Sequence, residues 1–150
     1  MMKFVALVVL ILLGSCSHKP AADDRSSVFA AVINTLYSQI QGNVSAVAIC
    51  RSGRTDIPHA VLAKIKVQSI PVIKCAGVES SAPDWRLRIK GSSKFAVELS
   101  VEKITFTSST AATVLANYSY GGLHAEGFTF TVHKYNQGWR VVKQAQSWIS

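Results

Sequence analysis

The second half of the chain alternates apolar and polar residues without a helical interruption, and this pattern limits the possible folds more than any other feature. In its first segment, Val97, Leu99 and Val101 share one face of a strand, and the alternation slips at Lys103, which predicts a β-bulge. Because side chains alternate across a strand, the pattern predicts four consecutive antiparallel strands. The segments that carry it are residues 95–106, 112–120, 128–132 and 139–141.

The first half of the chain predicts two helices. Residues 28–41 repeat apolar side chains at helical spacing, with acids and serines before them as caps. Residues 57–65 repeat that spacing, with Asp56 as the N-cap. Residues 44–50 are apolar on both faces and predict an inner strand. Residues 70–75 predict an edge strand or an extended loop, because a proline interrupts them.

Two helices followed by an antiparallel meander predict an α+β domain, with both helices packed on a curved antiparallel sheet of four to six strands. A chain of 150 residues provides one such domain. From Gly127 through the hairpin loop to Trp139-Arg140-Val141, the sequence resembles the closing hairpin of cystatin-like and NTF2-like domains. The resemblance implies a cone-shaped sheet with a concave side. It implies no functional residue, because these superfamilies share shape far more than chemistry.

The first fifteen residues have the dimensions of a secretory signal peptide. A short positive start with Lys3 precedes an unbroken apolar run over residues 4–13. A transmembrane helix needs about 20 apolar residues, so this run is too short to cross a bilayer. At Leu13-Gly14-Ser15-Cys16 the chain resembles the bacterial lipobox, in which an aliphatic residue and two small residues precede a cysteine.

The lipobox resemblance implies diacylglycerol on the Cys16 thiol, cleavage before Cys16 and acylation of the new amino terminus. Ser17 stands where the family's inner-membrane retention signal has Asp, which implies the outer membrane. The alternative is an ordinary signal peptide cut after residues 20–22. The expected organisation is therefore a signal peptide over residues 1–15, a lipid-anchored polar tether over residues 16–27 and a folded domain over residues 28–150. Fully extended, residues 17–27 reach about 36 Å.

Two cysteines remain once Cys16 carries the lipid. An even number of cysteines in an exported chain predicts a disulfide between Cys50 and Cys75. The bond closes a loop of about 25 residues, which is worth roughly 3 kcal/mol in the chain-entropy model. Neither cysteine belongs to a Cys-x-x-Cys motif or has metal-ligand spacing.

The chain is basic, with a formal net charge of +8. Cleavage before Cys16 removes Lys3 alone among the charged residues and leaves +7, which favours anionic partners. Residues 85–90 predict a strand with Trp85 on its apolar face and a basic row on the other face. This row either meets phosphates of an envelope component or only protects an edge strand from pairing. Its members are Arg86, Arg88 and Lys90, with Lys94 just beyond.

A glycine-rich loop over residues 121–127 contains the other candidate functional residues. His124 and Glu126 can reach a common ligand or act as acid and base, and the alternative is a solvated surface pair. Nearby aromatic residues either line a concave pocket or fill the core. They are Tyr118, Tyr120, Phe128 and Trp139.

The sequence contains no nucleophile motif, cofactor motif or metal-ligand spacing. It therefore predicts a non-enzymatic envelope lipoprotein without a cofactor, attached to the membrane by its lipid and binding a partner protein or an anionic envelope component. Nucleic acid is not an expected partner, because no stacking-aromatic motif accompanies the basic row. Two alternatives remain, namely a small-ligand binder or enzyme of the NTF2-like type, and an accessory subunit of a secretion or assembly complex.

Overall fold

The computed structural model describes residues 21–66, 69–122 and 124–150. The Leu13-Gly14-Ser15-Cys16 motif lies outside these residues. Strands hold 52% and helices 18% of the described residues, so the fold is mostly β. In chain order the elements are α1 (Ala22–Tyr37), β1 (Ala46–Arg51), β2 (Thr55–Asp56), α2 (His59–Leu62), β3 (Val72–Ile73), the 3₁₀ turn η1 (Cys75–Gly77), β4 (Val78–Ser80), β5 (Leu87–Ile89), β6 (Ala96–Ser108), β7 (Ala111–Gly121), β8 (His124–Tyr135) and β9 (Gly138–Ile149).

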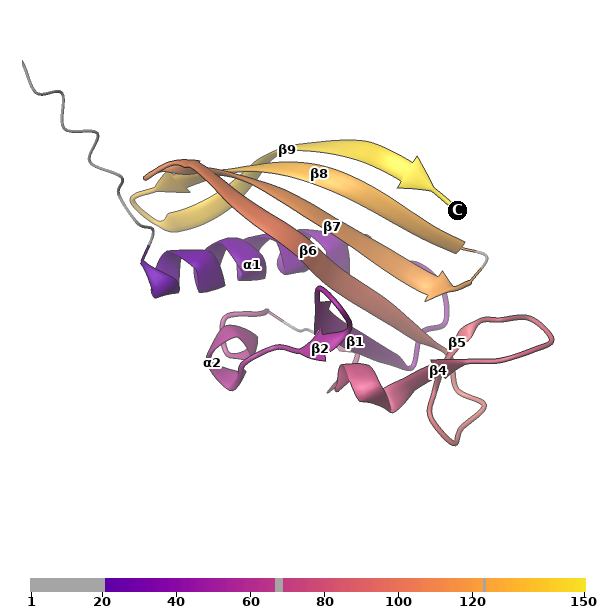
Figure 1. The fold of residues 1–150 in the computed structure, drawn as a ribbon. Coiled ribbons are helices and arrows are strands. Elements are labelled where there is room, and N and C mark those ends of the chain that lie inside the picture. Colours follow the sequence, from indigo (N-terminus) through magenta and orange to yellow (C-terminus); the bar gives the residue numbers. More distant parts are fainter. Residues whose placement is uncertain (1–20, 67–68, 123) are drawn as a thin grey trace, which may run out of the picture.

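A seven-stranded mixed sheet organises the molecule, in the order β2-β1-β6-β7-β8-β9 with β3 also paired to β1. The four long strands β6 to β9 form the expected antiparallel meander (Figure 1). The predicted bulge is confirmed, because the β6–β7 register shifts between Val101 and Lys103. Strand β1 runs parallel to β6 and is buried over residues 46–50, which confirms the inner strand.

Helix α1 lies across one face of this meander (Figure 1). Its apolar stripe, with Val32, Ile33 and Leu36 fully buried, packs against the sheet core around Leu99 and Phe130. Burying such side chains contributes about 1.5–3 kcal/mol each, so this contact stabilises the fold substantially. The sheet core beneath α1 is fully buried, with Phe130, Val114 and Val132 at 0% exposure.

The expected fold class is wrong, because the structure has one long helix and a large mixed sheet. The second predicted helix shrinks to the single turn α2, in which Val61 is buried. Asp56, the expected N-cap, lies in β2 instead, and its Oδ1 accepts a hydrogen bond from the Cys75 N–H at 2.7 Å. The turn α2 places Val61 against the core, and Ile65 reaches the core from the bend that follows, so apolar spacing alone overestimated the helix.

Helix α1 begins six residues earlier than its apolar spacing predicts. Asp23 forms an ion pair with Lys64, and Asp24 Oδ1 lies 2.7 Å from Lys134 Nζ and 2.9 Å from Trp139 Nε1. Hydrogen bonds from Lys134 and Trp139 lower the pKa of Asp24 below its usual value. Acids in the first turn also favour the helix through its dipole. Residues 22–27 are therefore helical and belong to the folded domain.

The Cys50–Cys75 disulfide is present, as predicted, with a Cα–Cα distance of 5.7 Å. It lies in a second, smaller apolar cluster on the side of β1 away from α1. The β4–β5 hairpin packs on this cluster through Val78 and Leu87. The disulfide therefore joins the central sheet to the segment that leads into that hairpin.

Candidate functional site

Two distant segments of the chain cross in close contact at Gly121. Arg86 forms an antiparallel bridge with Gly121, and the Gly122 N–H donates a hydrogen bond to the Trp85 carbonyl oxygen at 3.1 Å. A Cβ on Gly121 would lie only 2.1 Å from that oxygen, and the Gly121 φ of +132° disfavours any other residue. The crossing fixes the loop before β5 against the β7–β8 turn.

Trp85 is held in an unusual conformation at this crossing. Its φ is +54°, a rare value for a bulky side chain. Its side chain is nonetheless 50% exposed, so burial of the indole does not stabilise this backbone conformation. Strained residues of this kind cluster at binding sites, where the surrounding structure determines their geometry. Trp85 is therefore a candidate binding residue whose backbone is held in place before any ligand arrives.

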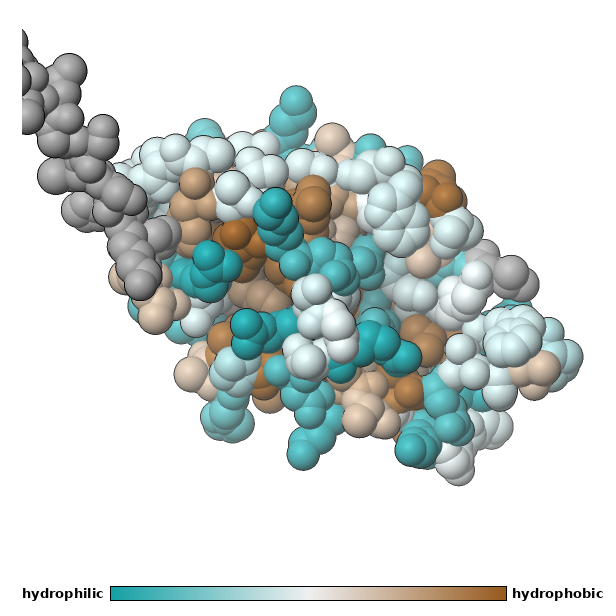
Figure 2. All heavy atoms as spheres, viewed as in Figure 1, coloured by the Kyte–Doolittle hydropathy of each residue, from teal (hydrophilic) through white to brown (hydrophobic). Residues whose placement is uncertain are grey.

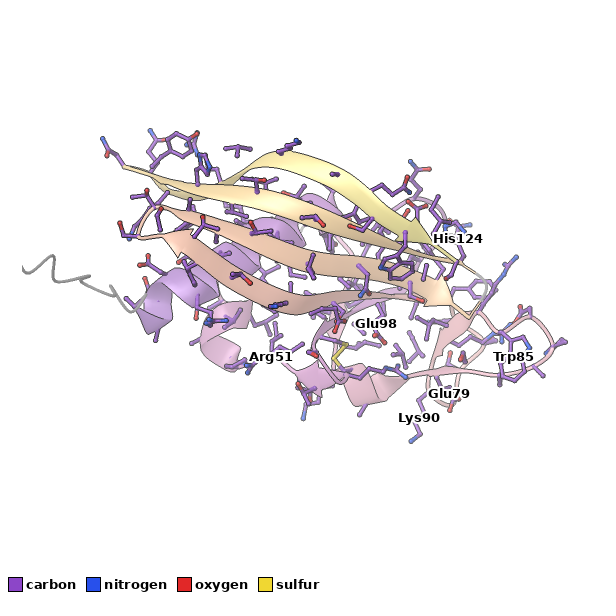
Figure 3. All side chains as sticks on the ribbon, turned by 45° about the horizontal axis from the view of Figure 1, so that its top comes forward. Arg51, Glu79, Trp85, Lys90, Glu98 and His124 are labelled. Atoms are coloured by element: carbon purple, nitrogen blue, oxygen red, sulfur yellow. A yellow bond between two sulfur atoms is a disulfide. The ribbon has the colours of Figure 1, made fainter. Side chains whose placement is uncertain are left out.

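A pocket of about 370 Å³ opens beside Trp85. Its size falls within the range of about 300–1,000 Å³ typical of small-molecule sites. Figure 3 shows Trp85 and His124 at the same end of the molecule, on the hairpin loop and at the start of β8. We call this site the Trp85 pocket, and its lining residues are Asp84, Trp85, Arg86, Tyr120, Gly121 and His124.

An aromatic cluster supports the β7–β8 wall of the Trp85 pocket. The Tyr120 ring lies 5.6 Å from Tyr118 and 5.4 Å from His124, and Tyr118 lies 5.7 Å from Phe128. The Tyr120 hydroxyl accepts a hydrogen bond from the Gln41 N–H at 3.1 Å and donates one to the Gln41 carbonyl oxygen at 3.3 Å. These contacts hold the Tyr120 ring in place at the pocket.

Cations surround the single acid of the pocket. Asp84 Oδ2 lies 2.8 Å from Arg88 Nη2 and 3.9 Å from Arg86 Nε. Desolvation raises the pKa of Asp84, but hydrogen bonds from the Arg86 N–H and the Arg88 guanidinium outweigh it and lower the pKa. Both guanidinium groups also lie over the Phe95 ring, at 5.2 Å and 5.3 Å. Arg86 remains 63% exposed and can meet an anion in the pocket.

No protein-family model matches the chain, and neither a curated protein nor a solved structure matches it. Within residues 21–66, 69–122 and 124–150, no group of three His, Cys, Asp or Glu side chains is placed to hold a metal ion. No helix in the same residues is long and apolar enough to cross a membrane. The chemistry of the Trp85 pocket is defined by its own side chains.

The structure brings together members of both residue sets that the sequence singled out. Arg86 from the basic row and His124 and Tyr120 from the loop line one pocket. The rest of the basic row separates: Arg88 is engaged by Asp84, and Lys90 points away from the pocket (Figure 3). Lys94 is exposed and does not line the pocket.

The other candidate residues from the glycine-rich loop and its nearby aromatics lie either in the aromatic cluster beside the Trp85 pocket or in the hydrophobic core. Glu126 Oε2 accepts a hydrogen bond from Gln146 at 2.8 Å, and its Oε1 lies 3.9 Å from His124 Nε2. Burial, together with this carboxylate, raises the pKa of Tyr118, so its hydroxyl keeps its proton. Trp139 lies far from the pocket, because its indole is bonded to Asp24 at the start of α1.

Sequence reasoning missed Asp84 and placed Trp85 on the apolar face of a strand. Strand β5 begins only at Leu87, and Trp85 lies in the preceding turn, where its positive φ ends the alternation. Two features of the sequence indicated turns here, namely the turn-forming residues 80–84 before Trp85 and the Gly121-Gly122 pair. Neither signal shows that these two segments meet.

Proposed function

We propose that this protein is a non-enzymatic lipoprotein of the bacterial cell envelope that binds an anionic envelope component at the Trp85 pocket. The observation that carries the proposal is the exposed Trp85 side chain, whose backbone the Gly121 crossing holds beside Arg86 and His124. A side chain on a backbone that is already ordered loses less entropy on binding than one on a flexible loop, which is the main advantage of preorganisation. The positive net charge, +8 for the full chain and +7 after the proposed cleavage, also attracts anions to the whole molecule.

An anionic saccharide fits the chemistry of this pocket best. A sugar ring has an apolar C–H face that can stack on Trp85 and a rim of hydroxyl groups that the Asp84 carboxylate and the His124 imidazole can hydrogen-bond. A phosphate or carboxylate on the sugar would meet the exposed Arg86 guanidinium. Sugars of this kind occur in envelope polymers and lipid headgroups.

The arrangement of the pocket supports binding rather than catalysis. Its acid, Asp84, is paired with arginines and has a lowered pKa, so at neutral pH it has no proton to give. The arginine contacts also lower its basicity. A catalytic acid–base pair needs pKa values closer to neutrality than this carboxylate provides.

Replacing Trp85 tests the proposed site. We expect hexose 6-phosphate to shift the NMR signals of the Trp85 indole and of His124, and W85A to weaken binding about tenfold or more, because a central aromatic contact is lost. R86Q should weaken hexose phosphate binding by a similar factor while leaving any binding of the neutral hexose unchanged.

Trp148 provides a matched control for this experiment. It is 47% exposed, almost as much as Trp85, but it packs over Gly127 and does not line the pocket. W148A should therefore leave hexose phosphate binding unchanged. Equal losses in W85A and W148A, or equal binding of inorganic phosphate and hexose phosphate, would contradict the proposed saccharide site.

Membrane attachment through Cys16 is tested separately. We expect mass spectrometry of the purified mature protein to show a chain that begins at Cys16 and carries diacylglycerol and acyl masses. The C16A variant should leave the membrane fraction, because one or more acyl chains supply the attachment. A mature chain that begins elsewhere, or an unmodified thiol, would refute the lipoprotein proposal and leave the pocket proposal standing.

A further inference from the structure

Half of strand β6 has a free edge. Along residues 96–101, β6 pairs with β1 on one side, and the Ser52 N–H donates the last hydrogen bond of this side to the Val101 carbonyl oxygen. The chain then turns at residues 52–54 and returns as β2 on the other edge of β1. Among the described residues, the remaining part of β6, residues 102–108, pairs only with β7. At about 3.4 Å per residue, this edge is about 24 Å long.

A groove of about 590 Å³ runs beside this free edge, between α1, the β2–α2 segment and β6. Its floor is apolar and includes Phe29, Val61 and Ile104. Figure 2 shows this region as a hollow with brown side chains at the bottom and teal side chains around it. We call it the β6 groove. It is a separate site from the Trp85 pocket, as the positions of Arg51 and Trp85 in Figure 3 show.

The rim of the β6 groove is richer in cations than in acids. Arg25, Arg51 and Lys103 line it, against Asp56 and Glu102. Both acids already accept hydrogen bonds from inside the domain, Asp56 from the Cys75 N–H at 2.7 Å and Glu102 from the Ser100 hydroxyl at 2.7 Å. Arg51 is exposed and forms no ion pair with a described acid. The groove therefore favours an acidic occupant over a basic one.

We propose that the β6 groove binds an extended acidic peptide segment of a partner protein, which adds a strand to the free edge of β6. In this mode of recognition the main chain pairs with the exposed edge, and alternate side chains enter the neighbouring groove. Apolar side chains of the peptide would contact Phe29, Val61 and Ile104, and its acids would face Arg51 and Lys103. A second copy of this chain is disfavoured as the occupant, because two molecules with the same large positive net charge repel each other.

A peptide of alternating valine and glutamate, blocked at both ends and about ten residues long, is the probe, because this length covers the free edge. A valine–lysine peptide is its charge control. With the purified full-length protein, we expect the valine–glutamate peptide to slow amide hydrogen exchange within residues 102–108. The R51E/K103E variant should bind it at least about tenfold more weakly, and the K90E/K94E variant, with the same charge change outside the groove, should bind it normally.

N-methylation of the peptide separates strand addition from simple charge attraction. The amides of alternate residues point to opposite edges of a strand, and the peptide can reverse its direction to present either edge, so the form used carries a methyl group on every backbone amide and has no donor for β6. Strand addition requires that this form loses binding. Equal binding of this form and the parent, equal binding of the lysine peptide, or no binding of the parent would each overturn the proposal. None of these outcomes depends on the hexose phosphate result at the Trp85 pocket.

Discussion

The G121A variant is expected to lose about 3 kcal/mol or more of folding free energy and to lose the Trp85 pocket. Two costs combine at this position. The φ of +132° is unfavourable for alanine, and the new methyl group would lie 2.1 Å from the Trp85 carbonyl oxygen and 2.7 Å from the Arg86 Cα. Both obstructing atoms belong to the backbone, so relief requires the two segments to separate. Urea denaturation measures the stability, and the Trp85 indole NMR signal reports the pocket.

Two other glycines allow these costs to be measured one at a time. Gly138 has a φ of +108° with open space around it, so G138A measures the conformational cost alone, about 1–2 kcal/mol. A methyl group on Gly127 would meet the Trp148 ring, an exposed side chain that can move aside, so G127A should cost less than about 1.5 kcal/mol. A G121A variant no less stable than these two would show that the crossing is not fixed as described.

Removing the disulfide in a C50A/C75A variant is expected to cost roughly 3 kcal/mol, because the closed loop between positions 25 residues apart no longer restricts the unfolded chain. For a domain of this size the melting temperature should fall by about 10 °C. The exposed fractions of Cys50 and Cys75 are 0% and 2%, so a reductant should act on the native protein only after local opening.

Thermal unfolding with and without reductant checks the disulfide prediction. The wild-type protein should lose stability in reductant once it has been unfolded and refolded under reducing conditions, whereas C50A/C75A should be insensitive to reductant throughout. Because Asp56 of β2 is bonded to the Cys75 N–H, the variant should also loosen the β2 wall of the β6 groove. Unchanged stability in the variant would mean that the loop is already ordered in the unfolded chain.

The sheet could be predicted from the sequence where local pattern and tertiary burial agree. Strands β6 to β9 alternate cleanly, and the slip at Lys103 marked the bulge correctly. The inner strand β1 was recognisable because both of its faces are apolar. The parallel pairing of β1 with β6 was not predictable, because it joins segments about fifty residues apart and leaves no local signature.

The lengths of the two helices were predicted wrongly, because they depend on contacts with residues far away in the sequence and not on local pattern. The start of α1 is stabilised by Asp24 bonding to Lys134 and Trp139, more than a hundred residues away. The turn α2 stops after Leu62, although the apolar spacing continues to Ile65. In both cases tertiary contacts outweighed local propensity, which is only a weak guide.

Some residues of the Trp85 pocket could be predicted from the sequence, but their assembly into one site could not. Arg86, Tyr120 and His124 were identified from charge and from the glycine-rich loop, but as members of two unrelated sets. Their meeting depends on the Trp85–Gly121 crossing, in which a residue without a side chain admits the backbone that leads into β5, a strand of the separate β4–β5 hairpin. A single sequence marks such a glycine as a turn residue and does not say which segment it admits.

If Cys16 carries the proposed lipid, the early start of α1 limits the distance between the domain and the membrane. If Cys16 carries the lipid, only residues 17–21 separate it from the helix, and five residues span at most about 18 Å in any conformation. The β6 groove, lined by Ala22 and Arg25, would then stay close to the bilayer surface, while the Trp85 pocket, at the far end of the molecule from the start of α1, would face outward. Such a short link would hold the two sites at different distances from the membrane. The β6 groove would be available to partners at the membrane surface, and the Trp85 pocket to molecules farther from it.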